Sequence, residues 1–332
     1  MPDPPVVQAR RTFLAGSLAA LLAPSLTLAQ PPRVARLGLL ASSTSENFAA
    51  SMKIFRNSLQ ALGWVEGQNL AIEARYTGVR YDQLPALAAE LVKLEVDVIL
   101  ALATPAIQAA KRATTTIPIV FETLGDAVSN GLVTNLARPS GNATGWSGFA
   151  PELSGKRLEL IRELLPGAAR VALLANRTNA STTTVLQRTE AAAQQLRMQL
   201  LVADVQASAG LDPAFESMVR ERSEAFVVAP DPMLFSVRRR IVELAARHRL
   251  PAVYEYRLFA ELGGLLSYGP ESNERFRRAA VYVDRILRGA KPGDLPVEQP
   301  STFELVINLV TANRLRLTIP PSVRLRADHV ID

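Results

Sequence analysis

The amino-acid sequence predicts an α/β protein that folds as two units, each a parallel sheet with helices on both faces. Short apolar runs alternate along the chain with segments whose apolar residues recur every three or four positions, which is the pattern of successive βα units. The alternation restarts after residue 150. The chain has 332 residues, 48% of them hydrophobic, which is enough apolar mass for two cores.

The N-terminal segment reads as an export signal rather than as part of the fold. Paired arginines at positions 10 and 11 precede an apolar run over about 15–28, which ends in small residues. The pair favours a twin-arginine signal over a general secretory signal with a chance Arg-Arg pair. We therefore expect a signal peptide over residues 1–29. The run is too short for a membrane anchor, and the absence of cysteine excludes a lipid anchor there.

Four strands and three helices are expected in the first unit. Serine and threonine residues follow the first apolar run as helix caps, and Gly63 closes that helix. Thr104 is expected to cap the third helix, with Pro105 at its first position. The expected strands are 33–40, 70–76, 96–101 and 117–121, and the first two helices are about 48–62 and 82–94.

The same pattern continues in the second unit. Strands are expected at 171–175, 199–204, 225–229, 251–255 and 263–267, and helices at 152–165, about 180–197, 212–222, 234–248 and 272–288. A late strand over 303–309 cannot be assigned to either unit from periodicity. Glycines at 141, 145 and 148, between prolines at 139 and 151, predict a crossover between the units.

Several classes of function lack the residues that they need. There is no cysteine, and the two histidines, His248 and His329, lie among charged residues, so thiolate chemistry, a histidine triad and a metal site are not expected. No GxGxxG, GxxxxGK[ST] or GxSxG motif occurs. The net charge is only +6, because acidic residues alternate with the basic ones along most of the chain. The Arg238–Arg240 run is expected to be a solvated helix face. We expect no cofactor, no nucleic-acid partner and no enzyme activity.

Polar residues gather where predicted strands end. In open parallel sheets ligands bind beyond the carboxyl ends of the strands, near helix N-termini. Each polar segment taken alone has a simpler interpretation as a helix cap. The prediction of a small polar ligand therefore depends on the common placement of the segments rather than on any single one. The segments are 42–44, 103–106, 125–126, 176–178 and 230–232.

Six phrases of the sequence resemble a known family. They are LGWVEGQNL at 62–70, YDQLP at 81–85, TTTIPIVF at 114–121, RPSGNATG at 138–145, KRLEL at 156–160 and FELVINL at 303–309. Together they are similar to the ABC transporter substrate-binding proteins related to tryptophan-binding (TrpX-like) receptors, over about residues 33–332. The resemblance implies the type I periplasmic-binding-protein fold: two Rossmann-like lobes with parallel sheets, three crossovers and a ligand cleft at the hinge. The lobes would be 32–148 plus about 268–301, and 149–267 plus about 302–332.

The resemblance also implies a set of ligand-contacting residues. A carboxylate would be held at Thr104 and the amide of Ala106, and Asp231 would receive an ammonium group. Ala127 stands where the family's Gly-Asp-Pro-Val motif has proline, which alters the loop after Asp126. The tyrosines would stack on an apolar part of the ligand, with core or hinge packing as the alternative. The full set is Ser42, Ser43, Thr44, Thr104, Pro105, Ala106, Asp126, Asn176, Thr178, Asp231, Tyr254 and Tyr268.

The expected function is that of a periplasmic receptor of an ABC importer, which captures an amino acid or related small polar compound by lobe closure. We expect a soluble, exported monomer whose partner is a permease in the inner membrane. Two alternatives remain at this point: a sensing receptor for a signalling partner, and a secreted α/β enzyme. A cytoplasmic repressor of the same fold is disfavoured by the export signal.

Overall fold

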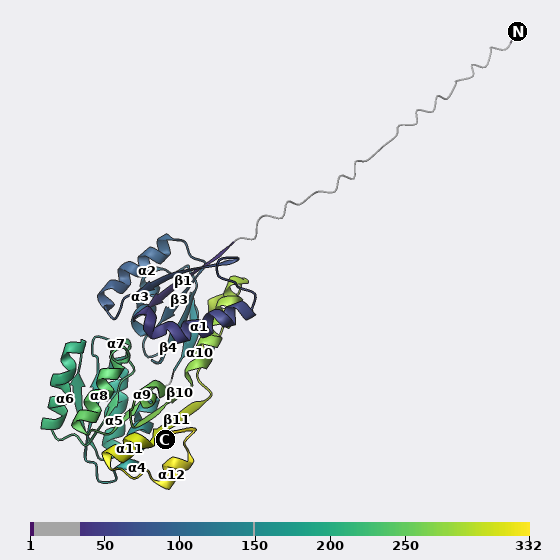
Figure 1. Cartoon of the computed structure of the whole chain (residues 1–332). Helices are drawn as coiled ribbons and strands as arrows, with labels where there is room; N and C mark the ends of the chain where they lie inside the picture. The colour runs from purple at the N-terminus through teal and green to yellow at the C-terminus, as the bar shows by residue number, and fades with distance from the viewer. Residues whose placement is uncertain (3–33, 149) are drawn as a thin grey trace. The chain divides into compact units, whose positions relative to one another are not determined.

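The computed structural model describes residues 1–2, 34–148 and 150–332, and residues 34–332 form one compact unit. The predicted signal peptide over 1–29 therefore lies outside the described residues, apart from the first two. The unit contains two sheets, each built mainly of parallel strands with helices packed against it, and they are called the first and the second lobe here (Figure 1).

The first lobe is built on a five-stranded parallel sheet. The strand order is β2-β1-β3-β4-β5, so the chain starts near the middle and winds outward in both directions. β3 is apolar throughout, β4 is apolar up to Phe121 and ends in Glu122 and Thr123, and both are fully buried, as expected for a sheet covered on both faces. The strands are β1 (Ala35–Ala41), β2 (Leu70–Tyr76), β3 (Val98–Leu102), β4 (Ile119–Thr123) and β5 (Ala143–Ser147).

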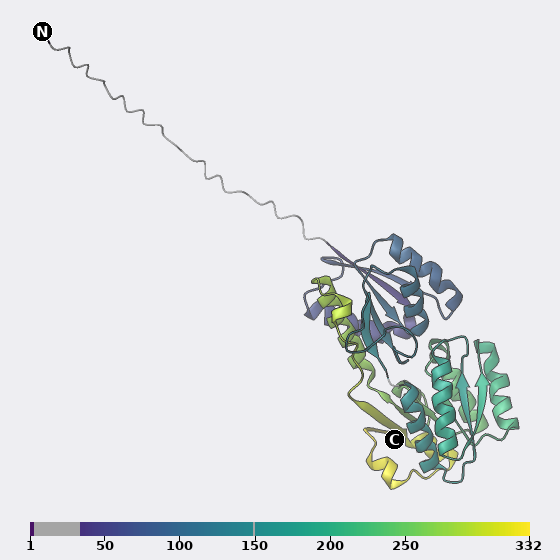
Figure 2. The ribbon, with the colours of Figure 1, turned by 180° about the vertical axis from the view of Figure 1, so that it is seen from behind.

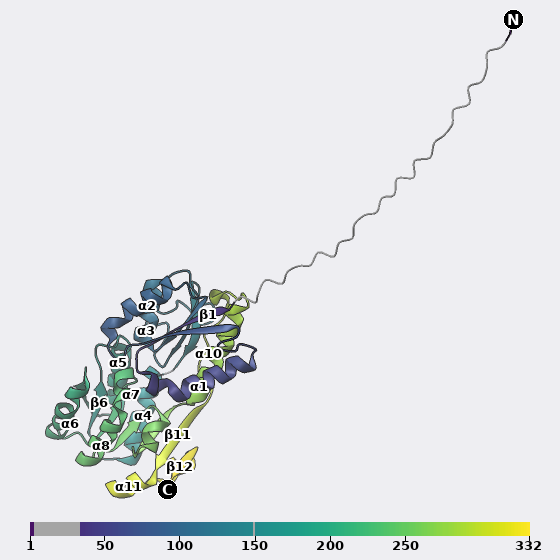
Figure 3. The same cartoon turned by 45° about the horizontal axis from the view of Figure 1, so that its top comes forward.

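Helices cover both faces of this sheet. One core forms under α1 and α10, where Phe48 packs edge-on against Phe276 at 6.5 Å between ring centroids. The other core lies under α2 and α3. Thus α10, late in the sequence, lies beside α1 in the first lobe (Figure 3). The helices are α1 (Ser45–Ala61), α2 (Leu84–Lys93), α3 (Thr104–Ala113) and α10 (Ser272–Leu287), with short 3₁₀ turns η1 (Tyr81–Gln83) and η3 (Pro292–Asp294).

The second lobe is built on a seven-stranded sheet of order β12-β11-β10-β9-β8-β6-β7. All neighbouring strands are parallel except β10 and β11, so the expectation of a parallel sheet fails at this one pair. The pair is antiparallel because β11 enters the lobe from the opposite end. The strands are β6 (Arg170–Ala175), β7 (Gln199–Asp204), β8 (Ala225–Val228), β9 (Ala252–Tyr254), β10 (Leu266–Pro270), β11 (Phe303–Asn308) and β12 (His329–Ile331).

Two further cores lie on the two faces of the second sheet. Figure 2 shows the helices of this lobe from behind, with the strands between them. The helices are α4 (Ala150–Leu164), α5 (Thr182–Gln195), α6 (Leu211–Arg220), α7 (Pro232–Ser236), α8 (Arg238–His248), α9 (Arg257–Glu261), α11 (Leu309–Leu315) and α12 (Pro321–Leu325), with the 3₁₀ turn η2 (Ser208–Gly210).

The chain passes between the lobes three times: after β5, between β10 and α10, and before β11. The predicted crossover over 139–151 contains β5, which the sequence did not predict as a strand. The strand expected over 303–309, which periodicity did not assign to either lobe, is β11 of the second sheet. β10 spans the predicted lobe boundary at 268 and stays in the second sheet to Pro270.

The start of α3 differs from its prediction by one residue. Ala103, not Thr104, is the N-cap, and it adopts a positive φ of 69°. This conformation is uncommon outside glycine. It places Thr104 in the first helical turn, where its hydroxyl hydrogen-bonds to the hydroxyl of Thr123 at 2.8 Å rather than to a helix amide. Thr104 therefore faces the end of β4, at the edge of the sheet where a ligand is expected.

Candidate ligand-binding site

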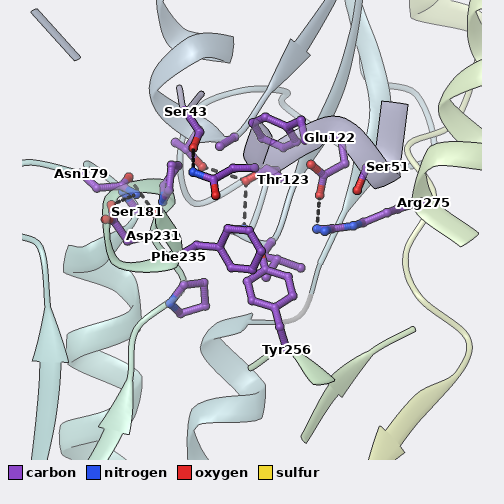
Figure 4. Close-up of a pocket in the computed structure, with 18 residues that line it drawn as sticks. Ser43, Ser51, Glu122, Thr123, Asn179, Ser181, Asp231, Phe235, Tyr256 and Arg275 are labelled. Atoms are coloured by element: carbon purple, nitrogen blue, oxygen red, sulfur yellow. Dashed lines mark hydrogen bonds and ion pairs between the residues drawn. The ribbon is translucent and has the colours of Figure 1, made fainter. Parts of the chain in front are cut away.

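A cavity lies between the two lobes at the carboxyl ends of their strands (Figure 4). About 620 Å³ of space free of protein atoms lies within it, including space open to solvent. The first lobe contributes Ser43, Asn47, Phe48, Ser51, Ala103, Thr104, Glu122, Thr123, Leu124, Gly125 and Arg275, and the second lobe contributes Asn179, Ser181, Pro230, Asp231, Pro232, Phe235 and Tyr256.

Asp231 is the most heavily hydrogen-bonded acid of this cavity. It is the N-cap of α7 and accepts from the amide of Leu234 at 3.0 Å. Asn179 donates to Oδ2 at 2.9 Å, and Asn176 lies 3.3 Å from both carboxylate oxygens. Burial raises the pKa of Asp231 above its usual value, while these donors oppose the shift. The donors fix one buried acidic group at the edge of the second sheet.

The two lobes are joined directly by hydrogen bonds beside the cavity. Tyr81 of the first lobe donates to Oδ2 of Asp231 at 2.9 Å and accepts from the amide of Met233 at 3.2 Å. Burial raises the pKa of Tyr81, so its hydroxyl stays protonated and can donate. On another side, Arg238 of α8 donates to Oδ1 of Asn47 at 2.7 Å. Protein atoms from both lobes therefore meet around the cavity.

Hydroxyl groups line the rim of the first lobe. Ser42 accepts from the amide of Ala106 at 3.1 Å, which ties the first loop to the start of α3. Ser43 accepts from the side chain of Asn47 at 3.0 Å, and Thr44 caps α1 through the amide of Asn47. The amino ends of α1 and α3 thus converge on this rim, a placement that favours a negative group of a ligand.

Aromatic rings form the apolar part of the cavity. Phe48 comes from the first lobe, and Phe235 and Tyr256 come from the second. The rings of Phe235 and Tyr256 meet edge-to-face at 5.0 Å, and Arg238 covers Phe235 with its guanidinium carbon 4.5 Å from the ring centre. These contacts hold the rings in place, so the cavity presents rigid apolar walls to a flat ligand group.

The comparisons with known proteins agree in one family. The model of the ABC transporter substrate binding protein family matches residues 29–331. The chain belongs to this family. A tyrosine-binding protein of Clostridioides difficile is 25% identical over 278 residues, covering 84% of this chain and 78% of its own.

Two solved structures are similar over nearly the whole of this substrate-binding protein. A conserved domain protein of Vibrio cholerae has 28% identity and a TM-score of 0.84, covering 90% of this chain and all of its own. The ABC domain in complex with L-Trp from Streptococcus pneumonia has 25% identity and a TM-score of 0.83, covering 90% and 99%. The type I periplasmic-binding-protein fold expected from the sequence is confirmed.

Three of the twelve residues expected at the ligand line the cavity of this substrate-binding protein: Ser43, Thr104 and Asp231. Ser42, Pro105 and Ala106 are buried, and Thr44 is half-buried at the start of α1. Asn176 donates to Asp231 and accepts from the hydroxyl of Thr178. The side chain of Asp126 accepts from the amide of Ser129 and closes a turn beside the cavity. Ligand contact by any of them stays a prediction.

The two tyrosines expected to stack on a ligand are placed away from the cavity lining. Tyr254 is fully buried in the second lobe, stacked on Phe259 at 4.6 Å. Tyr268 stacks on Phe303 at 6.2 Å, and its carbonyl accepts from Arg157. Tyr254 belongs to β9 and Tyr268 to β10, and both rings pack against other residues of the second lobe. Tyr256, two residues beyond Tyr254 and past the end of β9, is the tyrosine that lines the cavity.

Other cavity residues were not singled out by sequence reasoning. Phe48 and Arg275 lie in segments that the sequence predicts as helices, about 48–62 and 272–288, and nothing in those patterns marks either as a ligand contact. Glu122 carried a signal that could have been used, because it directly follows the strand expected over 117–121, and a charged residue buried at the end of an apolar strand needs a partner. Its partner is Arg275, 153 positions along the chain.

A second buried acid lies behind the cavity wall. Glu255 is next to Tyr256 and 1% exposed, and neither of its carboxylate oxygens has a hydrogen-bond partner among the described residues. Burial raises the pKa of Glu255 to about 8, against the opposing charge of Arg157 and with a small contribution from Asp231. Glu255 therefore holds its proton at neutral pH.

This shift predicts a loss of stability with rising pH. The folded-state pKa lies above the ordinary value of 4.5, so the folded protein binds the proton more tightly than the unfolded chain does. The contribution of Glu255 to the free energy of unfolding is fully present below pH 4.5 and is lost as the pH rises toward 8. Urea unfolding at pH 5, 7 and 8.5 measures it. Glu255→Gln should flatten the dependence, and a wild-type free energy of unfolding that rises over this window contradicts the assignment.

Over residues 34–148 and 150–332, no group of three or more acidic or histidine side chains is close enough together to hold a metal ion. No helix in the described part of the chain has the length and apolar character needed to cross a bilayer.

Proposed function

We propose that this substrate-binding protein is the exported receptor of an ABC importer, that it captures an L-amino acid with an aromatic side chain, and that it delivers this solute to a permease from the periplasm as a monomer. The observation that carries the proposal is the make-up of the cavity. Two buried carboxylates, those of Asp231 and Glu122, two helix amino ends and three aromatic rings face a single space between the lobes.

The amino-acid head group fits the polar end of this cavity. The ammonium group would lie against the carboxylate of Asp231, which its hydrogen-bond donors hold in place. The carboxylate would lie against the hydroxyls of Ser43 and Thr104, near the amino ends of α1 and α3, where helix dipoles favour negative charge. The amide of Ala106 is already engaged by Ser42, so it supports this rim rather than the ligand.

The side chain fits the aromatic part. Phe48 belongs to one lobe and Phe235 and Tyr256 to the other, so a ring between them contacts both lobes only when these are closed. Binding then shifts the equilibrium toward the closed form, as lobe closure requires. The relatives that bind tyrosine and L-Trp support an aromatic amino acid.

The test is a binding screen on the processed protein purified from its host. Native mass spectrometry identifies any solute that co-purifies. Isothermal titration of the stripped protein against the twenty L-amino acids is expected to give binding for aromatic members and none for glycine, alanine or aspartate. At 100 times Kd, a true ligand should also raise the free energy of unfolding by about 2.7 kcal/mol. A co-purified sugar or nucleotide, with no amino acid bound, contradicts the proposal.

A further inference from the structure

An ion pair lies in the wall of the cavity, at the end away from Asp231 (Figure 4). Glu122 sits on β4 and Arg275 in the first turn of α10, with Oε1 and Nη1 2.7 Å apart. Their side chains are only 5% and 9% exposed, and both line the cavity. The pair is therefore a built feature of the site rather than a surface contact.

The position of the guanidinium group is fixed by aromatic rings. The Cζ atom of Arg275 lies 5.2 Å from the centre of the Tyr256 ring and 5.0 Å from that of Phe276. Glu122 is fixed by its strand, where it pairs in register with Leu102 and Trp146. Neither group can turn away without breaking these contacts, so the pair presents a defined donor and acceptor.

The charges decide which ligand group suits this end. Desolvating an ion pair costs free energy, and hydrophobic residues would serve better if the ligand ended in hydrocarbon. A lone carboxylate would be repelled by Glu122 and a lone ammonium group by Arg275, and the zwitterionic head group, which would suit both, is placed at Asp231 by the proposed function. A neutral group that donates to the carboxylate and accepts from the guanidinium meets neither penalty. A hydroxyl does both, whereas an indole N–H only donates.

We propose that the Glu122–Arg275 pair is a second recognition point, which selects an aromatic amino acid with a hydroxyl group at the far end of its ring. The inference rests on the proposed function and places the head group at Asp231. In Figure 4, Asp231, Asn179 and Ser181 lie at one side, Glu122, Ser51 and Arg275 at the other, with Phe235 and Tyr256 between them. That order matches head group, ring and hydroxyl of one extended ligand.

The test compares ligands that differ by this one hydroxyl. Isothermal titration of the wild type is expected to give an affinity for L-tyrosine about 100-fold or more above that for L-phenylalanine, because a site built to bind a hydroxyl leaves its polar groups unpaired otherwise. Glu122→Gln keeps the shape of the side chain and removes its charge. In this variant the ratio of the affinity for L-tyrosine to that for L-phenylalanine should fall below about 10-fold.

A matched control is available in the same lobe. Glu298 pairs with Arg278 of α10 but does not line the cavity, so Glu298→Gln should leave the wild-type ratio in place. Thermal unfolding of each variant, followed by circular dichroism, establishes that it is folded. If Glu122→Gln fails to fold, the ratio in the wild type alone decides the proposal.

Three outcomes would overturn the proposal that the Glu122–Arg275 pair binds a ligand hydroxyl. Equal affinity of the wild type for tyrosine and phenylalanine removes the hydroxyl contact while leaving an amino-acid receptor in place. A Glu122→Gln variant that weakens both ligands by the same factor indicates that the pair holds the head group, so the ligand lies the other way round. Failure of every amino acid to bind overturns the proposed function together with this inference.

Discussion

Replacing Asp231 by alanine is expected to weaken ligand binding by about 100-fold or more. Removing one partner of a buried, hydrogen-bonded charge pair costs about 3–5 kcal/mol, and every ~1.4 kcal/mol is a tenfold change in affinity. In this site the loss is compounded, because Tyr81, Asn176 and Asn179 all donate to the same carboxylate. Isothermal titration with the ligand found by the screen measures the effect.

Asp231 has two roles that must be separated, one in contacting the ligand and one in joining the lobes. Tyr81→Phe removes the hydroxyl that joins the lobes and leaves the carboxylate in place, so it should cost less than Asp231→Ala. Tyr76→Phe changes a tyrosine on β2 and serves as the matched control. An affinity that is unchanged in Asp231→Ala rules out any contact between this carboxylate and the ligand.

Replacing Gly145 by alanine is expected to destabilise the first lobe by more than about 4 kcal/mol, the size reached by severe steric substitutions. Gly145 lies in β5, opposite Phe121 of β4, with φ of 151°. A Cβ atom there would lie 2.1 Å from the carbonyl oxygen of Phe121 and 2.7 Å from its nitrogen. Both are backbone atoms, so only separation of the two strands relieves the clash.

Urea unfolding of Gly145→Ala against the wild type measures this cost. Gly63→Ala is the control, because Gly63 also has a positive φ, of 95°, but nothing lies within 4 Å of its added Cβ. Its cost should be that of backbone strain alone, about 1–3 kcal/mol. Similar losses in the two variants would mean that strand contact is not what requires glycine at 145.

The sequence predicted most strands and helices because their signals are local. Leucines three or four apart mark α2, and unbroken apolar runs mark β3 and β6. β5 was missed because Thr144, Gly145 and Trp146 form no apolar run, and its pairing with β4 comes from the tertiary structure. β12 was missed for a related reason: it is three residues long and largely exposed.

The candidate site was predictable only in part. Residues that follow a strand, such as Ser43 and Asp231, could be placed at the sheet edge because parallel strands end together. Phe48 and Arg275 lie within helices, where the same residue types usually serve the core or the solvent. Glu122 and Arg275 come into contact only after the chain has passed between the lobes and returned. The spacing of these residues along the sequence therefore does not predict their ion pair.

The bonds from Tyr81 to Asp231 and from Arg238 to Asn47 involve no solute. Each is worth about 1–3 kcal/mol, and that free energy favours closure in the empty receptor as well as in the loaded one. Part of the population should then be closed without a ligand, and under the proposed function such molecules would present a permease with the shape of the ligand-bound receptor. In the importer proposed above, the strength of these hydrogen bonds would set how often the permease meets an empty closed receptor, and how steeply uptake responds to a low solute concentration.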